Sequence, residues 1–217
     1  MKHNKQSRRP KDEMKHAAIL KAATRLFLKN GYTNTSMDAI ADAARVTKQT
    51  VYSHYSNKDA LFTHMVASLS EKQSISDALL QDSDVPVEQL LYDIGLSFLN
   101  LMTSREVLAT TRLVIVEAQL YPKLAERYYE GGTQHLITLF SGFLARQNKR
   151  RALAIPDTAS AASYFLAMLK GRYYLSMILS LKQVPSSKDK EMHVRETVSV
   201  FLRIYGGKNA MHTKSIF

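Results

Sequence analysis

A short predicted helix begins with four polar residues, Lys48, Gln49, Thr50 and Ser53. Thr47 precedes them, and its hydroxyl can cap the helix by accepting a hydrogen bond from a backbone N–H group. Lysine can donate to O6 and N7 of guanine, glutamine can pair with N6 and N7 of adenine, and the threonine methyl can contact that of thymine. Side chains of these types at one end of a helix could therefore read the edges of base pairs.

The surrounding residues 35–62 predict two short helices joined by a tight turn, with a third helix beginning behind them. Ser36 can cap the first helix. Its apolar residues recur at i, i+3, i+4 and i+7, the spacing of one helical stripe, and are Met37, Ile40, Ala41 and Ala44. The second helix, 48–55, should turn Val51 and Tyr55 inward and leave its polar residues outside. Helix-turn-helix proteins insert the start of this second helix into the major groove of DNA.

The segment IADAARVTKQTVYSHYSNKDALF resembles the DNA-binding motif of the TetR/AcrR family of bacterial one-component transcriptional regulators. The resemblance implies that Lys48, Gln49, Thr50 and Ser53 face bases or sugars, while other residues bond phosphates. The expected DNA-contacting set comprises Thr35, Ser36, Thr47, Lys48, Gln49, Thr50, Tyr52, Ser53, His54 and Lys58. Physical chemistry agrees for Lys58, which begins the next helix, because backbone amides and the helix dipole favour an anion there.

Arg45 departs from the family pattern, which usually has glycine at this position of the turn. A residue other than glycine in the left-handed conformation costs roughly 1–2 kcal/mol. Either the turn differs slightly here or the protein tolerates the strain. Whether this arginine also reaches a phosphate or is only a solvated turn residue stays open on the sequence.

Composition and charge are typical of a nucleic-acid binder. The 217 residues carry a net charge of +11, with 12 Lys and Arg against 5 Asp and Glu in residues 1–64, and 18 against 14 in residues 65–217. A basic segment is the electrostatic footprint of nucleic-acid binding, although basic surfaces also bind membranes or keep proteins in solution. Cysteine is absent, which excludes disulfides, thiolate nucleophiles and cysteine-ligated zinc.

An all-helical enzyme, the main alternative class, finds little support in the sequence. The seven histidines are scattered, none pairs at the i, i+4 spacing of a metalloprotease, and no phosphate loop, dinucleotide fingerprint or nucleophile elbow occurs. We therefore expect no catalytic residue, metal or cofactor. Residues 1–16 lack the apolar run of a secretory signal, and no apolar stretch reaches the roughly 18–20 residues of a membrane span. A cytoplasmic protein without a membrane partner is expected.

The chain as a whole predicts an all-α fold. Residues 1–11 form a basic flexible arm that either stays solvated or follows DNA. Residues 12–64 form a three-helix helix-turn-helix domain whose first helix spans 12–30, and residues 65–217 form a larger helical domain. A long helix is expected from Lys58 toward Leu79 and Leu80. Periodicity between turn signals predicts about nine or ten helices, the later ones at 87–104, 106–120, 123–130, 133–147, 157–182 and 188–205.

The segment RLVIVEAQLYPKLAERYYEGG is similar to the C-terminal domain of an AefR-like subgroup of the same family. The resemblance implies a pocket in which an unknown small-molecule effector shifts the protein between DNA-competent and DNA-incompetent forms. Candidate pocket residues mix apolar walls with polar groups and are Tyr92, Phe98, Met102, Thr111, Val114, Glu117, Tyr128, Phe140 and Met168. Glu117 could instead form a structural ion pair or face outward, because a buried carboxylate needs a partner.

The last two predicted helices carry apolar faces that need burial, formed by Ala162, Phe165, Leu166, Leu169, Tyr173, Val198, Phe201 and Leu202. These faces could pack within one chain, but the resemblance implies that they pair across a two-fold axis in a homodimer. A dimer places two reading helices about 34–36 Å apart, which matches successive major grooves of a palindromic operator. The sequence thus predicts a ligand-responsive homodimeric repressor of double-stranded DNA. The alternative is a DNA-binding adaptor whose C-terminal domain binds a protein partner instead of a small molecule.

Overall fold

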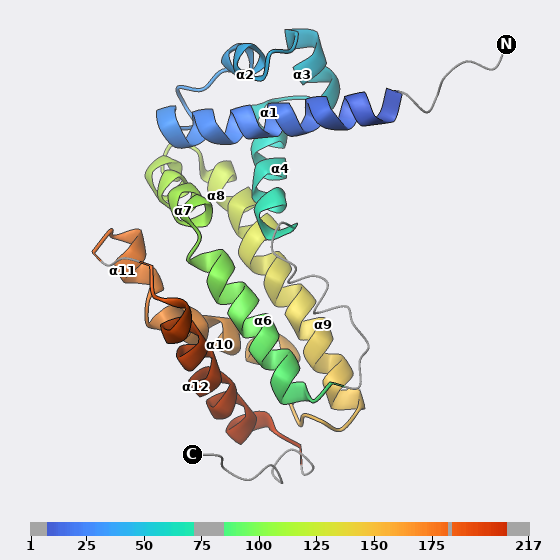
Figure 1. Cartoon of the computed structure of the whole chain (residues 1–217), viewed down its shortest axis with the longest axis vertical. Coiled ribbons are helices and arrows are strands. Elements are labelled where there is room, and N and C mark those ends of the chain that lie inside the picture. The colour runs from blue at the N-terminus through green and yellow to red at the C-terminus, as the bar shows by residue number, and fades with distance from the viewer. Residues whose placement is uncertain (1–7, 72–84, 182–183, 208–217) are drawn as a thin grey trace, which may run out of the picture. The chain divides into compact units, whose positions relative to one another are not determined.

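α-Helices form almost all of the regular structure in the computed structural model, which describes residues 8–71, 85–181 and 184–207 (Figure 1). Within these ranges no β-strand occurs, and the single β-type pairing is an isolated bridge between Leu153 and Gly206. The predicted all-α fold class is therefore confirmed. The residues cluster into a head unit, Met1–Ser68 with Ala109–Gly131, and a body unit, Leu69–Leu108 with Gly132–Phe217.

The head unit is built around the two short helices of the predicted motif. Its helices are α1 (Arg8–Asn30), α2 (Met37–Ala44), α3 (Lys48–His54), most of α4 (Lys58–Glu71), the end of α7 (Arg105–Glu117) and α8 (Pro122–Tyr128). Apolar residues at helical spacing close one core, in which Ile19, Phe27, Ile40 and Phe62 have no exposed surface. The rings of Phe27 and Phe62 meet edge to face with centroids 5.8 Å apart. This core gives α2 and α3 a rigid support.

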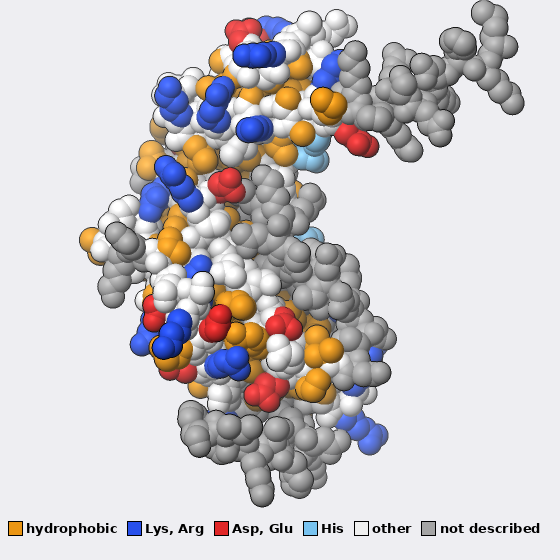
Figure 2. Space-filling view, in the orientation of Figure 1, with side chains coloured by type: hydrophobic (Ala, Val, Ile, Leu, Met, Phe, Trp, Pro, Cys, Tyr) orange, Lys and Arg blue, Asp and Glu red, His pale blue; other side chains and the backbone are white. Residues whose placement is uncertain are grey.

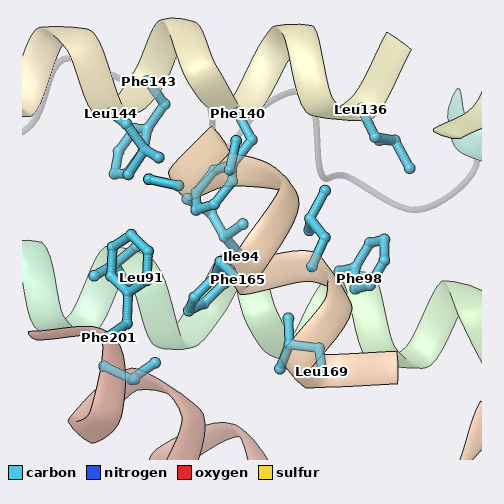
Figure 3. Packing of buried hydrophobic residues seen from close by; sticks show 14 of the residues in the cluster. Leu91, Ile94, Phe98, Leu136, Phe140, Phe143, Leu144, Phe165, Leu169 and Phe201 are labelled. Atoms are coloured by element: carbon cyan, nitrogen blue, oxygen red, sulfur yellow. The ribbon is translucent and has the colours of Figure 1, made fainter. Parts of the chain in front are cut away.

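The body unit has a separate aromatic core. Its helices are α6 (Val87–Met102), α9 (His135–Lys149), α10 (Thr158–Gly171), α11 (Tyr174–Ile178) and α12 (Ser187–Tyr205). Figure 3 shows Phe140 of α9 and Phe165 of α10 pointing toward one another, with ring centroids 5.1 Å apart. At Gly95 of α6 an added Cβ would lie 2.9 Å from a methyl group of Val194, so α6 and α12 approach closely there.

Two predicted helices have different limits in the structure. α1 begins at Arg8 instead of residue 12, so the last part of the predicted arm is helical, while residues 1–7 lie outside the described residues. The predicted helix 157–182 is divided, because α10 ends at Gly171 and α11 begins at Tyr174. Glycine is a poor helix former and apolar periodicity alone does not reveal such an interruption.

The predicted break at Gly131 and Gly132 is wrong. A π-helix, Tyr129–Gln134, carries the chain without interruption from α8 into α9, because glycine makes a helix less stable but does not forbid it. The compact unit that contains the helix-turn-helix reaches residue 68 and takes in 109–131, and the limits 12–64 of the helix-turn-helix domain stay a prediction. α4 is described to Glu71, and its predicted continuation toward residue 80 lies outside the described residues.

Candidate nucleic-acid interface

Both helices of the motif begin at the predicted capping residues. The Ser36 hydroxyl accepts a hydrogen bond from the N–H group of Ala39 at 3.1 Å, and the Thr47 hydroxyl accepts one from Thr50 at 3.2 Å. These bonds satisfy backbone donors that would otherwise lack a partner at a helix start. Local sequence therefore sets where α2 and α3 begin.

The turn between α2 and α3 has the left-handed geometry that the family normally assigns to glycine. Arg45 adopts φ 56° and ψ 43°, and its N–H group donates to the carbonyl oxygen of Asp42 at 3.1 Å. The sequence left open whether the turn differs or the protein tolerates a strained backbone at Arg45, and the structure shows the strained backbone. The cost is about 1–2 kcal/mol, and the side chain of Arg45 is exposed.

α3 buries one side and exposes the other. Val51 and Tyr55 are 0% and 5% exposed and pack into the head core, whereas Lys48, Gln49 and Ser53 face outward. Two further members of the predicted set, Tyr52 and Thr50, are exposed and partly exposed respectively. Figure 2 shows Lys and Arg side chains gathered over α1, α2 and α3. The exposed side of α3 is thus a polar surface with basic residues around it.

Lys48 is oriented by a neighbour on α2. Its ammonium lies 2.8 Å from a carboxylate oxygen of Asp38, and both side chains are largely exposed. The hydrogen bond that Lys48 donates to Asp38, together with the negative charge of Asp38, raises the pKa of Lys48. This lysine is therefore fully charged at neutral pH, and a base contact requires it to exchange the carboxylate for a guanine edge.

Two residues expected to bond phosphates serve the protein itself. Thr35 is only 1% exposed and its hydroxyl donates to the carbonyl oxygen of Gly31 at 2.8 Å, so its side chain faces the interior. The Lys58 ammonium donates to the carbonyl oxygens of Tyr32 and Thr35 at 2.8 and 3.0 Å, and lies 4.4 Å from the centre of the Tyr32 ring. The sequence did not reveal the two bonds of Lys58 because each joins residues more than 20 positions apart.

A histidine cluster lies behind α3. The His16 ring stacks on Tyr55 with centroids 5.5 Å apart and meets His64 and His54 at 5.0 and 5.9 Å. His54, another predicted phosphate contact, is partly buried and has Nε2 3.4 Å from a carboxylate oxygen of Asp12. Burial lowers the pKa of His16, the two neighbouring histidines lower it further, and Asp12 opposes them.

We expect the head to be less stable in mild acid because of this cluster. Because the folded-state pKa of His16 lies below its ordinary value of 6.5, the unfolded chain binds more protons as pH falls through about 6.5, and stability declines. We expect the melting temperature to fall between pH 7.5 and 5.5, and His16→Gln to show a smaller fall. The exposed His135→Gln is the matched control and should keep the full decline. Equal pH profiles for His16→Gln and the unaltered chain would contradict this prediction.

Aspartates do not complicate that measurement. The hydrogen bond from the Tyr32 hydroxyl, together with Arg127 at 2.6 Å, holds the pKa of Asp59 below its usual range despite partial burial. Hydrogen bonds from Ser160 and Ala159 act likewise on the pKa of Asp157. The stability contributed by a carboxylate with a lowered pKa is lost only as pH falls below about 4. The window from pH 7.5 to 5.5 therefore reports on histidines.

The nine candidate pocket residues fall into two groups. Those of the head unit are Thr111, Val114, Glu117 and Tyr128, and those of the body unit are Tyr92, Phe98, Met102, Phe140 and Met168. Phe98 and Met102 line a cavity of about 130 Å³ in the body unit. Lys170 lines the same cavity and was absent from the predicted set. A lysine beside the apolar face of the predicted helix, within residues 162–173, was the sequence feature that could have pointed to Lys170.

Glu117 binds the loop between α1 and α2. It is 8% exposed, and its Oε1 accepts hydrogen bonds from the N–H groups of Tyr32 and Thr33 at 2.9 and 3.3 Å, while Oε2 accepts one from the Thr33 hydroxyl at 2.7 Å. The partner that a buried carboxylate requires is therefore a backbone loop of the head unit. Thr111 and Tyr128 also pair within this unit, through their hydroxyls at 2.5 Å.

The predicted dimer-interface residues belong to the core of a single chain. Those with at most 6% of their surface exposed are Ala162, Phe165, Leu166, Leu169, Val198 and Phe201. The remaining two, Tyr173 and Leu202, are partly buried against the same core. Within one chain α6 and α9 pack against these faces, and the pairing of the two helices across a two-fold axis stays a prediction. Large apolar side chains that do remain exposed on α12 are Met192, Val200 and Ile204.

Neither a membrane span nor a metal site appears in the part of the chain that the structure describes. No helix there combines the length and apolar character needed to cross a bilayer. The same residues contain no group of three or more histidine, aspartate or glutamate side chains able to hold a metal ion.

The fold and the polar side of α3 define a helix-turn-helix transcriptional regulator. Residues 19–65 match the model of the bacterial regulatory proteins of the tetR family, and residues 89–207 match that of the AefR-like transcriptional repressor C-terminal domain. The second match alone covers more than half of the chain. The chain belongs to the TetR family of bacterial transcriptional regulators, so its role is in transcription and not in catalysis.

Individual relatives agree with this assignment. The HTH-type transcriptional regulator YdeS of Bacillus subtilis (strain 168) is 33% identical over 121 residues, 55% of this chain and 58% of that protein. The chain thus spans little more than half the length of this curated relative. A solved TetR-family regulator from Mesorhizobium loti MAFF303099 has a TM-score of 0.77 and 28% identity, covering 90% and 98% of the two chains. The flavonoid-responsive regulator FrrA has a TM-score of 0.71 and 30% identity, covering 89% and 98%.

Proposed function

We propose that this TetR-family regulator is a cytoplasmic, ligand-responsive repressor that binds a palindromic operator as a homodimer. One observation carries the proposal: Val51 of α3 and Tyr55 directly after it are buried, whereas Lys48 and Gln49 at the start of α3 and Ser53 one turn later are exposed. These are the donors and acceptors that major-groove recognition uses. Thr50 belongs to the same set that faces bases or sugars, and the other expected contacts would position α3 on the phosphate backbone: Ser36, Thr47, Tyr52 and His54.

Direct phosphate contacts by Thr35 and Lys58 form a weaker part of this proposal. The Thr35 side chain is buried, and the Lys58 ammonium is already hydrogen-bonded to loop carbonyls. Lys58 lies at the start of α4, where a nearby phosphate would still be favoured by the helix dipole. We therefore propose that Lys58 acts on DNA affinity chiefly by holding the α1–α2 loop in place.

Dimerisation follows from the size of the reading helix. α3 has seven residues, and one such helix contacts too few bases for specific binding. Two copies about 34–36 Å apart would reach successive major grooves. We propose that the exposed apolar side chains of α12, Met192, Val200 and Ile204, contribute to the contact between copies.

Release from DNA would be controlled by a small molecule bound to the body. FrrA is named as flavonoid-responsive, which supports ligand control in a protein of similar fold and sequence. An effector that changes operator affinity 5- to 150-fold needs a coupling free energy of only about 1–3 kcal/mol. By linkage the operator must weaken effector binding by the same factor.

Replacing Gln49 with alanine tests the reading role of α3. A gel shift against DNA from the protein's own promoter region first supplies an operator. Gln49→Ala should then lower affinity for it by about 1–3 kcal/mol and relax the preference at one base pair, since an adenine edge loses its partner. Gln134→Ala, an exposed glutamine of the body, should leave binding unchanged. Equal losses on operator and random DNA would refute base reading by Gln49.

A further inference from the structure

A cavity in the body unit has apolar walls and one charged group. Phe98 and Met102 of α6, Leu136 of α9 and Leu166 of α10 form the walls, and the Lys170 side chain lines the same space. The cavity measures about 130 Å³. An apolar cavity of about 150 Å³ in another protein holds benzene. The space therefore suits a molecule with a single ring or a short chain.

Lys170 has no anionic partner among the described residues. Its ammonium lies 5.8 Å from the centre of the Phe98 ring and 5.3 Å from that of Tyr174. No salt bridge within 4.0 Å joins it to a carboxylate in the described part of the chain. Aromatic faces compensate the charge of a cation only partly. The charge at this cavity is therefore incompletely neutralised by the protein.

The solvent does not fully compensate this charge either. Burial lowers the pKa of Lys170, which means that its surroundings disfavour the charged form. The position at the end of α10 gives some relief, because the negative end of a helix dipole favours a cation. A bound anion would supply the missing partner, and the apolar walls would receive the rest of the molecule.

We infer that this cavity binds a small apolar monoanion, a carboxylate or phenolate with one ring or a short chain, whose charge meets Lys170. The inference rests on the proposed function, because it names the chemical class of the effector sensed by the body. One cation favours one negative charge. The Ser163 hydroxyl, which also lines the cavity, offers a second hydrogen bond to the same headgroup.

Benzoate, with benzyl alcohol as its neutral counterpart, tests the charge requirement. Calorimetric titration of the full chain at constant ionic strength should show benzoate binding at least roughly 10-fold more tightly, because a charge-assisted hydrogen bond contributes about 1.5–3 kcal/mol. Lys170→Met should weaken benzoate roughly 10- to 100-fold and remove the preference over benzyl alcohol. Equal binding of the two compounds, no binding of either, or an unchanged preference in Lys170→Met would overturn the inference.

Lys190→Met is the matched control. Lys190 is also a partly buried lysine of the body unit, its pKa is lowered by burial, and its ammonium donates to the Asn100 side chain at 3.0 Å outside the cavity. This variant should bind benzoate as the unaltered chain does. An equal loss in both lysine variants would indicate a general charge effect and overturn the assignment to Lys170.

The operator complex separates this inference from the proposed function. If benzoate binds through Lys170 and releases the operator in a gel shift, the anion site and ligand control of DNA binding are both supported. If benzoate binds through Lys170 but the shift persists, the anion site stands and ligand control through this cavity fails. If benzyl alcohol binds as tightly as benzoate and releases the operator, ligand control stands and the charge requirement is overturned.

Discussion

Replacing Glu117 with alanine should lower the free energy of unfolding by about 2–4 kcal/mol, because two backbone N–H groups and a hydroxyl lose a charged acceptor. The groups left behind belong to Tyr32 and Thr33, and the N–H group of Tyr32 is buried. Water reaches this donor poorly, so the full cost of an unsatisfied polar group applies. Urea denaturation followed by circular dichroism measures the change.

Two further variants test the cause of this loss. Glu117→Gln keeps one carbonyl oxygen that can still accept a hydrogen bond from the loop. Its free energy of unfolding should therefore fall less than that of the alanine variant. Glu126→Ala removes an exposed carboxylate from the same unit and should change stability by less than about 0.5 kcal/mol. Similar losses for Glu117→Ala and Glu126→Ala would show that the buried hydrogen bonds contribute little.

The position of Glu117 also explains a glycine in the loop. Gly31 has φ +85°, and a Cβ added there would lie 3.0 Å from Oε1 of Glu117. Glycine adopts this left-handed conformation without the cost that a side chain imposes. The loop can therefore curve tightly around the carboxylate. The hydrogen bonds of Glu117 depend on this close approach.

Phe165→Ala should be the most destabilising single change in the body unit, at about 3–5 kcal/mol. The Phe165 ring has no exposed surface and packs between Phe140 and Phe201, with centroids 5.1 and 5.0 Å away. Its removal leaves a cavity that neighbouring helices cannot fill completely. Thermal and urea unfolding of the purified variant would measure the loss.

An exposed aromatic residue provides the comparison for Phe165. Tyr129 is 54% exposed, so Tyr129→Ala should alter stability by no more than about 0.5 kcal/mol. If Phe165→Ala cost as little as Tyr129→Ala, the aromatic core described for α9, α10 and α12 would not govern the stability of the body.

Local patterns were sufficient to predict the DNA-reading motif. Ser36 and Thr47 cap their helices as expected, and Val51 and Tyr55 are buried, because capping and helical periodicity involve residues only three or four positions apart. The all-α class followed in the same way from repeated helical spacing. The left-handed backbone of Arg45 was the one local feature that the sequence left open.

The sequence could not predict which helices cover each apolar face. Periodicity showed that the faces containing Phe165 and Phe201 must be covered, but the hydrophobic effect is not directional and does not say which element covers them. Within one chain the structure packs them against α6 and α9, and the pairing with a second chain that the resemblance implies stays a prediction. The sequence also did not distinguish the glycine at which a helix ends, Gly171, from the glycine through which the helical chain continues, Gly131.

The sequence by itself determined the helical class and the polar start of α3, since these rest on local spacing and capping, and it indicated the family through the resemblance of two segments to known motifs. Only the tertiary structure decided that Glu117 and Lys58 both bind the α1–α2 loop and that Lys170 lines a cavity. Hydrogen bonds between Glu117 and Tyr32 span 85 positions. Such a pairing leaves no periodic trace in the sequence, because it depends on how separate helices pack together.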